Sequence, residues 1–541
     1  MHKSVLAHVD GPRLERLDQL IWIGDIPALG ARTCPERIAI AFPDRNQSIS
    51  YAALDHGANA FVAEMHALGL ESGARIAYLG RNSDLYFPAL FGAIRGDYVL
   101  VPLNWRLTAA EIAYQLEDSQ SRVLLYDPDL AALGAQSIAG LKAPPLMLTT
   151  EADSAAGGLR AMLSRPAPVW SGTHGHDQII LQLYTSGTTG RPKGVLISHG
   201  ALSLQRHAEL VLPEFSHLKQ GCVCLSAMPN FHVGGMSWVL MGLVRLGTVV
   251  ITADATPANI LRLISEHGAE HSFIVPTVIR AIVDELRAHD APAPPMRGIY
   301  YGAMAMSESL LRETIQVFNC PLTQFFGMTE NTGPVTYLGP AEHDPTRPRL
   351  LKSVGRPYPG TSIEIRSNDG RVLTSQEHGE IWINSPARML GYWNLADKTD
   401  EALRDGWYAS GDGGFVDEQG YLYLTDRIKD MIVSGGENIY PAEVEEALRR
   451  HPLILDVAVV GLPDERWGEQ VAAAIELRTG CRVNDEELLQ FARQQIAGFK
   501  CPRIIRFVQS LPRTASGKVQ RGRVRQTLLE ASLSNCHSAE T

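Results

Sequence analysis

The densest run of chemical groups in the 541-residue chain is a turn over residues 184–194, which holds three glycines, three threonines, a serine and a lysine. It follows an apolar run over residues 179–184. Glycines let backbone N–H groups approach an anion closely, and hydroxyl groups with an ammonium add donors and positive charge. This composition favours a polyphosphate-binding loop. It is not a Walker A loop, because Lys193 is followed by Gly194 instead of Ser or Thr.

Four later segments also bring acids, bases and glycines together at short spacing. They are residues 326–330, 408–412, 426–430 and 512–518. A single Asp, Arg or Lys is usually a surface residue, so these segments carry weight only as an ordered set. In that order, and with the loop at 184–194, they resemble the motifs of the adenylate-forming superfamily, which includes acyl-CoA synthetases, luciferases and peptide-synthetase adenylation domains. The resemblance runs from about Pro35 to Arg525.

The resemblance implies a ligase that uses ATP, Mg²⁺ and coenzyme A. A carboxylate is a poor electrophile, and ATP converts it to a mixed anhydride with AMP as the leaving group. Charge builds on the α-phosphate during the attack, and the resemblance assigns its stabilisation to Lys518 and Thr329. Glu330 is implied as the Mg²⁺ ligand, since carboxylate oxygens suit this hard cation. The catalytic set that the motifs imply is Lys193, Thr329, Glu330 and Lys518.

The nucleotide contacts follow from the same resemblance, motif by motif. Asp412 is expected to accept hydrogen bonds from both ribose hydroxyls, and Arg427 to hold the same sugar from the other side. Phe326 stands where Tyr is usual and keeps an aromatic face for adenine. The expected phosphate and adenine positions are Thr185, Ser186, Gly187, Thr188, Thr189, Gly190, Lys193, Gly302, Ala303, Met304, Gln324, Phe325, Phe326, Gly327, Met328 and Thr329.

The sequence after residue 430 resembles the acyl-CoA synthetase branch of the superfamily. Ser434, Gly435 and Gly436 are expected to let the pantetheine chain pass close to the backbone. Trp467 is expected to pack near the nucleotide end of coenzyme A, with ordinary core packing as the alternative. Lys429 lies where the two domains of this family swivel between the half-reactions.

Residues 228–236 resemble the family's acid-pocket motif. Amino-acid-activating relatives place an Asp beside the Phe to hold the substrate ammonium, whereas this chain has His232 there, so an amino acid is disfavoured. The glycines, together with Met236, Trp238 and Met304, favour a roomy apolar pocket. Fatty, aryl, alicyclic and steroid acids all fit, and family prevalence favours a fatty acid. The expected acid-binding residues are His232, Val233, Gly234, Gly235, Met236, Gly302, Ala303 and Gly327.

Two other interpretations compete with a CoA ligase. One is a stand-alone adenylating ligase that transfers the acyl group to a separate carrier protein. The other is a catalytically silent nucleotide-binding protein. The silent protein is disfavoured because the chain retains all of Lys193, Glu330, Asp412, Arg427 and Lys518.

The elements that must position these residues alternate between helix and strand over most of the chain. Apolar residues at helical spacing over 51–68, and a capping box formed by Thr108 and Glu111, predict helices. Short apolar runs predict strands at 179–184, 222–226, 248–252 and 272–275. This alternation favours an α/β fold with largely parallel sheets.

Two changes in pattern divide the chain. Residues 354–424 consist of short apolar runs and Gly-rich turns, which predicts a β-rich subdomain that closes the large N-terminal domain. Beyond residue 427 the pattern is that of an α+β unit, with helices expected at 441–450 and 485–497. The predicted organisation is a large domain over 1–426, a hinge over 427–431 and a small mobile domain over 432–541.

The bulk composition excludes several classes of function. The net charge is −10, from 49 basic and 59 acidic residues, which disfavours nucleic acid and anionic membranes as partners. The seven cysteines are odd in number and show no pattern of a disulfide framework, and Cys501 stands where relatives often have a basic residue. No stretch reads as a signal peptide or an integral membrane segment. A cytoplasmic enzyme with small-molecule partners is expected, and both a monomer and a homodimer remain open.

Overall fold

A computed structural model describes residues 6–151, 157–170, 175–185, 191–304, 306–427, 430, 432–434, 437–464, 467–514 and 517–537. The chain forms two compact units, which are described separately here. The large unit comprises Val9–Ile363 and Ile383–Ala409, and the small unit comprises Met1–His8, Glu364–Trp382 and Ser410–Thr541. The predicted α/β fold class is confirmed in the large unit. The domain boundaries at residues 426 and 432 stay a prediction.

A nine-stranded sheet forms one layer of the large unit, with the strand order β16-β15-β14-β13-β12-β10-β11-β2-β3. Its central pairings, from β2 through β14, are parallel, and β15 is antiparallel to β14. The strands are β2 (Ile38–Phe42), β3 (Gln47–Ser50), β10 (Val223–Ser226), β11 (Thr248–Ile251), β12 (His271–Phe273), β13 (Gly298–Gly302), β14 (Leu322–Met328), β15 (Gly333–Leu338) and β16 (Arg356–Pro357).

Helices connect and cover these parallel strands, as expected for crossover connections. They are α7 (His199–Val211), α8 (Val233–Leu243), α9 (Pro257–His267), α10 (Pro276–Ala288) and α11 (Glu308–Phe318). Leucine and isoleucine side chains of α9, α10 and α11 form one apolar cluster with residues of β10, β11, β13 and β14. The carboxyl ends of the central strands therefore share one edge of the sheet, where the loops carry the candidate site.

A seven-stranded sheet, ordered β19-β9-β8-β5-β4-β6-β7, forms the other layer of the large unit. Its strands are β4 (Arg75–Leu79), β5 (Val99–Leu103), β6 (Val123–Tyr126), β7 (Leu146–Thr149), β8 (Ile179–Thr185), β9 (Lys193–Ser198) and β19 (Gly391–Tyr392). The accompanying helices are α2 (Tyr51–Ala67), α3 (Tyr86–Arg95), α4 (Ala109–Ser119) and α5 (Ala131–Ile138). The predicted capping box is present at α4, where Thr108 and Glu111 satisfy each other's backbone N–H groups.

The predicted β-rich character is confirmed over residues 354–424, although Glu364–Trp382 and the residues from Ser410 onwards belong to the small unit. The strands over residues 354–424 are β16, β17 (Ser362–Arg366), β18 (Gly379–Asn384), β19, β20 (Leu403–Arg404), β21 (Trp407–Val416) and β22 (Leu422–Arg427). A short helix, α12 (Ala396–Ala402), interrupts them.

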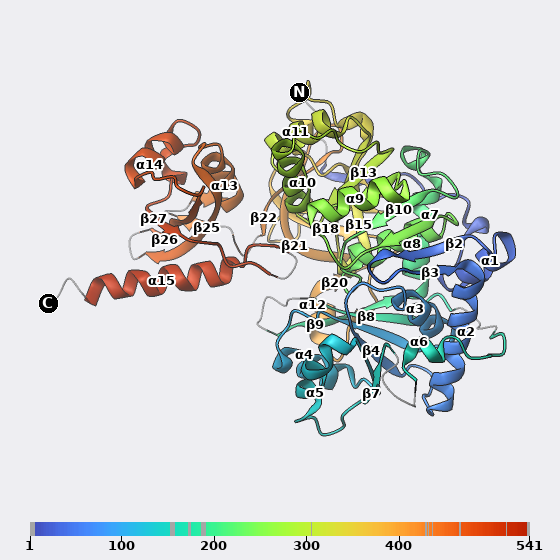
Figure 1. Ribbon diagram of the computed structural model, residues 1–541. Coiled ribbons are helices and arrows are strands. Elements are labelled where there is room, and N and C mark those ends of the chain that lie inside the picture. Colours follow the sequence, from blue (N-terminus) through green and yellow to red (C-terminus); the bar gives the residue numbers. More distant parts are fainter. Residues whose placement is uncertain are drawn as a thin grey trace. The chain divides into compact units, whose positions relative to one another are not determined.

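The last part of the small unit is built on a five-stranded sheet, with the path β24-β23-β26-β25 and β27 beside β26. The strands are β23 (Ile432–Ser434), β24 (Glu437–Ile439), β25 (Ile454–Asp464), β26 (Gly468–Leu477) and β27 (Ile504–Val508). Figure 1 shows α13 (Pro441–Arg449) and α14 (Asp485–Arg493) on one face of this sheet and α15 (Arg521–His537) on the other. Helix α14 ends before the predicted Ala497, because a turn there lays Ile496 against the apolar core.

Two predictions about the whole chain can be compared with the described residues. The six cysteines whose side chains are described are free thiols. Cys501 is buried in the core of the small unit, which accounts for an uncharged side chain at this position. None of the helices in the described part of the chain combines the length and apolar character needed to cross a lipid bilayer.

Candidate active site

The predicted phosphate loop connects two paired antiparallel strands. Thr185 ends β8 and lies opposite Lys193, which begins β9. The loop therefore starts and ends at one cross-strand pair. The predicted residues Ser186, Gly187, Thr188, Thr189 and Gly190 lie outside the described residues.

Lys193 is brought together with Glu330 by a third residue, Tyr392. The Lys193 ammonium lies 3.8 Å from the centroid of the Tyr392 ring, and the Tyr392 hydroxyl donates to Glu330 Oε1 over 3.1 Å. Burial lowers the pKa of Lys193, and the Glu330 carboxylate opposes that shift. The arrangement holds an ammonium and a carboxylate group close together at the C-terminal end of the predicted phosphate loop. Tyr392 was not singled out by sequence, because the two-residue strand β19 leaves no periodic pattern.

Backbone contacts fix the turn that carries Thr329 and Glu330. Residues 329–331 form one 3₁₀ turn directly after β14, and the Met389 N–H donates to Glu330 O over 2.7 Å. The Thr332 hydroxyl donates to Ala387 O over 2.6 Å. Glu330 is only 9% exposed, so its carboxylate is held in one orientation.

The residues near Glu330 fit a magnesium ion that arrives with a nucleotide. Glu330 supplies one carboxylate, and the described residues contain no group of three His, Cys, Asp or Glu that could hold a metal by themselves. Mg²⁺ commonly binds through one or two carboxylates, with phosphate oxygens and water completing its shell. The donor set is therefore suited to a metal–nucleotide complex.

Two glycines on adjacent strands are required by close packing. A Cβ on Gly302 would lie 2.4 Å from Phe325 O, and one on Gly327 would lie 2.0 Å from Gly333 O. Ala303 follows Gly302 in a left-handed conformation with φ of 64° and is exposed, while Met304 is half-buried. The two glycines therefore allow the ends of β13 and β14 to lie close to the neighbouring backbone at the edge of the sheet.

The residues of β14 are buried as far as Phe325, and the last residues of the strand are partly or fully exposed. Gln324 accepts a hydrogen bond from the Tyr301 hydroxyl over 3.3 Å. Phe325 is packed among other aromatic rings, whereas Phe326 and Met328 are half-buried. Only the second pair leaves side-chain surface open at the strand end.

The acid-pocket motif forms the start of α8, and its two glycines have different environments. A Cβ on Gly234 would meet only Met228 Cε and Phe273 Cε1, each at 4.0 Å. A Cβ on Gly235 would lie 2.2 Å from Pro229 O, so this glycine is required by packing. His232 and Val233 are half-buried at the helix start, and Met236 is fully buried.

Asn82 holds the loop that precedes this helix. Its carboxamide nitrogen donates to Met228 O over 2.8 Å and to Thr252 O over 3.0 Å, and its oxygen accepts from the Asn230 N–H over 2.9 Å. Sequence reasoning did not identify Asn82, since its partners lie more than a hundred residues away.

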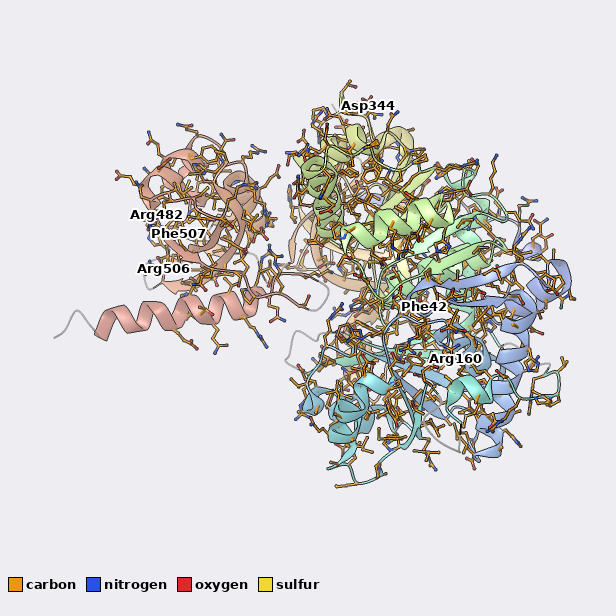
Figure 2. The ribbon with its side chains drawn as sticks, viewed as in Figure 1. Phe42, Arg160, Asp344, Arg482, Arg506 and Phe507 are labelled. Carbon is orange, nitrogen blue, oxygen red and sulfur yellow. The ribbon has the colours of Figure 1, made fainter. Side chains whose placement is uncertain are left out.

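The loop that carries Asn82 is itself anchored by an ion pair between the buried Asp84 and the half-buried Arg160. Asp84 is fully buried and accepts two hydrogen bonds from Arg160, over 2.7 and 2.9 Å. Figure 2 shows Arg160 in the lower layer of the large unit. This anchor limits the movement of Asn82 relative to β4.

In the small unit, the two predicted ribose contacts lie opposite each other. Asp412 on β21 is the cross-strand partner of Arg427 on β22. The Asp412 N–H donates to the Ser410 hydroxyl over 3.1 Å, and the Ser410 hydroxyl donates to Ile381 O over 2.6 Å. The hinge residue Lys429 lies outside the described residues.

Lys518 closes a tight turn in the small unit. Its N–H donates to the Thr514 hydroxyl over 3.1 Å, while its carbonyl accepts from the Thr514 N–H over 2.7 Å. The Lys518 side chain is exposed. The turn thus presents an ammonium group on the surface of the small unit.

The predicted coenzyme A residues occupy the same unit. Ser434 ends β23 and is buried, and Gly435 and Gly436 lie outside the described residues. Trp467 is half-buried with the Arg503 guanidinium 4.6 Å from its ring centroid, which leaves an aromatic face and a cation side by side.

Comparison with known proteins covers almost the whole chain. A family model described as AMP-binding enzyme matches residues 29–393, and one described as AMP-binding enzyme C-terminal domain matches residues 443–518. The chain is 37% identical to a fatty acid–[acyl-carrier-protein] ligase, ScoC, of Streptomyces coeruleorubidus, over 88% of this chain and 91% of that protein. It is 34% identical to a feruloyl-CoA synthase of an Amycolatopsis species, over 93% and 98%. The solved o-succinylbenzoate CoA synthetase of Bacillus subtilis, in complex with its acyl-adenylate, superposes with a TM-score of 0.81 at 28% identity, covering 93% of this chain and 98% of that one.

Proposed function

The chain belongs to the AMP-binding enzymes of the adenylate-forming superfamily, and on that premise we propose that it joins an apolar carboxylic acid to coenzyme A. The acid oxygen attacks the α-phosphate of ATP, which forms acyl-AMP and releases pyrophosphate. The thiol of coenzyme A then attacks the acyl carbon, which forms the thioester and releases AMP. An acid–thiol ligase of this class is what the relatives' names describe.

The assembly of Lys193, Tyr392 and Glu330 carries the proposal. Lys193 lies at the end of the phosphate loop and supplies positive charge for phosphate oxygens. Tyr392 orients the Glu330 carboxylate by its hydrogen bond of 3.1 Å, and Glu330 would hold Mg²⁺. When bound, Mg²⁺ neutralises charge on the departing pyrophosphate. The hydroxyl of Thr329 and the Lys518 ammonium are proposed to stabilise the α-phosphate during attack.

The other predicted residues complete the proposal. Asp412 and Arg427 hold the ribose, since they are cross-strand neighbours. Residues 434–436 and Trp467 bind coenzyme A, and the chain swivels at Lys429 between the two half-reactions. Domain boundaries at residues 426 and 432, and a cytoplasmic location where both ATP and coenzyme A are available, belong to the same proposal.

The acid is expected to bind at the start of α8. Gly302 and Gly327 allow the adjacent strand ends to approach each other, and Gly234 has room for a side chain at the helix start. The family-based expectation is a fatty acid, and aryl and alicyclic acids are the alternatives. Relatives act on both fatty and aryl acids by name. Transfer to a carrier protein is a second candidate, because ScoC is named as such a ligase.

Pyrophosphate release with a panel of acids tests the proposal. Addition of ATP, Mg²⁺ and one effective acid should release pyrophosphate, and further addition of coenzyme A should consume free thiol and yield AMP. Glu330→Gln keeps the side-chain size and should raise the Mg²⁺ concentration required. Glu266→Gln serves as the matched control, since this exposed carboxylate pairs with Arg262 on the surface of α9.

Two outcomes would count against the proposal. Absence of acid-dependent pyrophosphate release with every acid contradicts adenylation. Pyrophosphate release without thiol consumption favours the carrier-protein ligase instead.

A further inference from the structure

Gly234, at the start of the predicted acid-pocket helix, has room for a Cβ at ordinary van der Waals distances. Its nearest neighbours on the open side are Met228 Cε and Phe273 Cε1, each 4.0 Å from the position of an added Cβ. Gly235 has no such space, because Pro229 O occupies it. If the proposed function holds, on which this inference rests, the acid's apolar group lies against Gly234 and meets the Phe273 ring.

Phe273 belongs to a cluster of five packed aromatic rings, here called the aromatic wall. Its members are Phe215, Trp238, Phe273, Tyr300 and Phe325. The Phe273 ring stacks on Phe325 with centroids 6.2 Å apart and an interplanar angle of 15°, and Tyr300 lies 5.9 Å from Phe325 and 4.8 Å from Trp238. None of the five rings is more than 8% exposed. The rings therefore leave no room for an alkyl chain between them.

Trp238 connects α8 to the aromatic wall, because its ring centroid lies 6.3 Å from that of Phe273, the ring that borders Gly234. It lies one turn after Gly234 on α8, so both residues share a helix face. The Trp238 Nε1–H donates to Leu225 O over 2.8 Å, which fixes the indole against the sheet. Tyr300 is likewise held by a hydrogen bond of 2.8 Å between its hydroxyl and His217 Nε2. Neither ring can swing aside without losing a buried hydrogen bond.

A second opening beside α8 ends at a polar group. A Cβ on Gly333 would meet only Ser237 Oγ, at 4.0 Å. The Ser237 hydroxyl is buried and makes no hydrogen bond within the described residues. An alkyl chain in this direction would leave that hydroxyl unsatisfied, whereas a ring substituent with a polar atom could pair with it.

We propose that the aromatic wall restricts the enzyme to compact carboxylic acids, whose apolar part is about the size of one aromatic ring, and that Trp238 sets this limit. A long alkyl chain that passes Gly234 would have to displace at least the Phe273 and Trp238 rings. A flat aryl group needs no such displacement, and it gains contact with the Phe273 ring and the Met228 thioether.

Rates with acids of graded length test the proposal on the unmodified protein. Benzoic, hexanoic, dodecanoic and hexadecanoic acids are assayed with ATP, Mg²⁺ and coenzyme A by pyrophosphate release. The value of kcat/KM for benzoic or hexanoic acid should exceed that for dodecanoic acid by about a hundredfold or more, since pocket size alone discriminates by about tenfold per excluded group. A kcat/KM for dodecanoic acid equal to or above both compact acids overturns the inference and leaves the ligase function standing. No pyrophosphate with any acid overturns both.

Variants of Trp238 test whether this ring sets the limit. Trp238→Ala should raise kcat/KM for dodecanoic acid at least about tenfold and change that for benzoic acid far less. Trp238→Leu opens less space and serves if the alanine variant fails to fold. Trp170→Ala is the matched control, because that indole packs against His66 away from the wall and should change neither value. If a folded Trp238 variant leaves the chain-length profile unchanged, the assignment to this ring is wrong.

Discussion

The carboxamide of Asn82 donates to the carbonyl oxygen of Met228 over 2.8 Å and so joins the loop after β4 of one sheet to the loop after β10 of the other. Asn82→Asp keeps the side-chain shape but loses the donor to both Met228 and Thr252. Loss of the two buried bonds should destabilise the large unit by about 1–3 kcal/mol. Because the Met228 side chain borders Gly234, the KM for the acid should also rise, about tenfold, while the KM for ATP changes little.

Steady-state kinetics of this variant, with each substrate varied in turn, provide the measurement. Asn59→Asp is the matched control, since Asn59 acts as an acceptor for Arg95 and Trp170 and an aspartate can still accept. A lowered Tm with an unchanged acid KM would limit Asn82 to a structural role.

Tyr392 should affect the metal requirement more than the nucleotide affinity. Tyr392→Phe removes the hydrogen bond to Glu330 but retains the ring beneath the Lys193 ammonium. The Mg²⁺ concentration for half-maximal pyrophosphate release should rise about tenfold or more, as for the loss of one hydrogen bond to a charged group. Tyr392→Leu also removes the ring and should lower kcat further. Identical Mg²⁺ titrations for both variants and the wild type would contradict the role given to Tyr392.

Lys518 should matter for making the adenylate and hardly at all for consuming it. The residue lies in a turn of the small unit, far in sequence from the phosphate loop, and the resemblance implies that it reaches the α-phosphate in only one of two domain orientations. Lys518→Ala should lower acid-dependent pyrophosphate release by about a hundredfold. Chemically made acyl-AMP with coenzyme A should still yield thioester at nearly the wild-type rate. Equal loss of both steps in a folded variant would contradict the two-orientation scheme. Arg523→Ala, at an exposed position of α15 outside this motif, is the control.

The two glycines of the acid motif should respond differently to a methyl group. Gly234→Ala has room for its Cβ, so the protein should fold normally and lose kcat/KM for the bulkiest acid it accepts. Gly235→Ala would place its Cβ 2.2 Å from Pro229 O, so the Tm should fall whatever the acid. The sequence alone assigned both glycines to the pocket. Thermal unfolding and acid kinetics of the pair separate the two effects, and equal behaviour of the variants would refute the distinction.

Low pH should lower the free energy of unfolding of the large unit, because His343 becomes protonated on unfolding. Burial lowers the pKa of His343 to about 4, while its hydrogen bond to Gly339 O acts in the opposite direction. In the unfolded chain this imidazole titrates near 6.5, so the unfolded state binds more protons between the two values. The contribution of His343 to the free energy of unfolding is fully present above about pH 6.5. It decreases as the pH falls towards 4, by up to about 1.4 kcal/mol per pH unit.

Urea unfolding at pH 7.5 and pH 5 gives the measurement for His343. His343→Gln can keep hydrogen bonds to Gly339 O and the Tyr301 hydroxyl, but it does not titrate. The variant should therefore lose less stability between the two pH values than the wild type does. An unchanged difference would assign the acid sensitivity to other groups.

Sequence patterns predicted those helices and strands whose signal comes only from residues close together in the chain. The apolar run at 179–184 is β8, and the helical spacing at 51–68 is α2, because each element buries residues at its own period. The capping box at Thr108 needs only residues four positions apart or fewer, and it is present. The phosphate and acid sites could be predicted from the sequence because each motif is contiguous, and both stay predictions.

What sequence could not predict are contacts between distant segments. Tyr392 reaches Lys193 only because a two-residue strand pairs with β9, and Asn82 reaches Met228 only because two sheets meet. Gly234 and Gly235 are chemically identical and adjacent, and only the path of the preceding loop distinguishes them. These differences arise from tertiary packing, which no local period encodes.

The aromatic wall belongs to the interior of the large unit as well as to the proposed boundary of the acid site. Its rings come from α8, β12, β13, β14 and the turn that ends at Phe215. A single substitution that enlarged the site would create a cavity in the core, with a typical cost of about 3–5 kcal/mol for an aromatic residue replaced by alanine. Evolution towards longer acids would therefore require compensating changes elsewhere, so acid preference in this lineage should drift slowly and in steps that are paired with stabilising mutations.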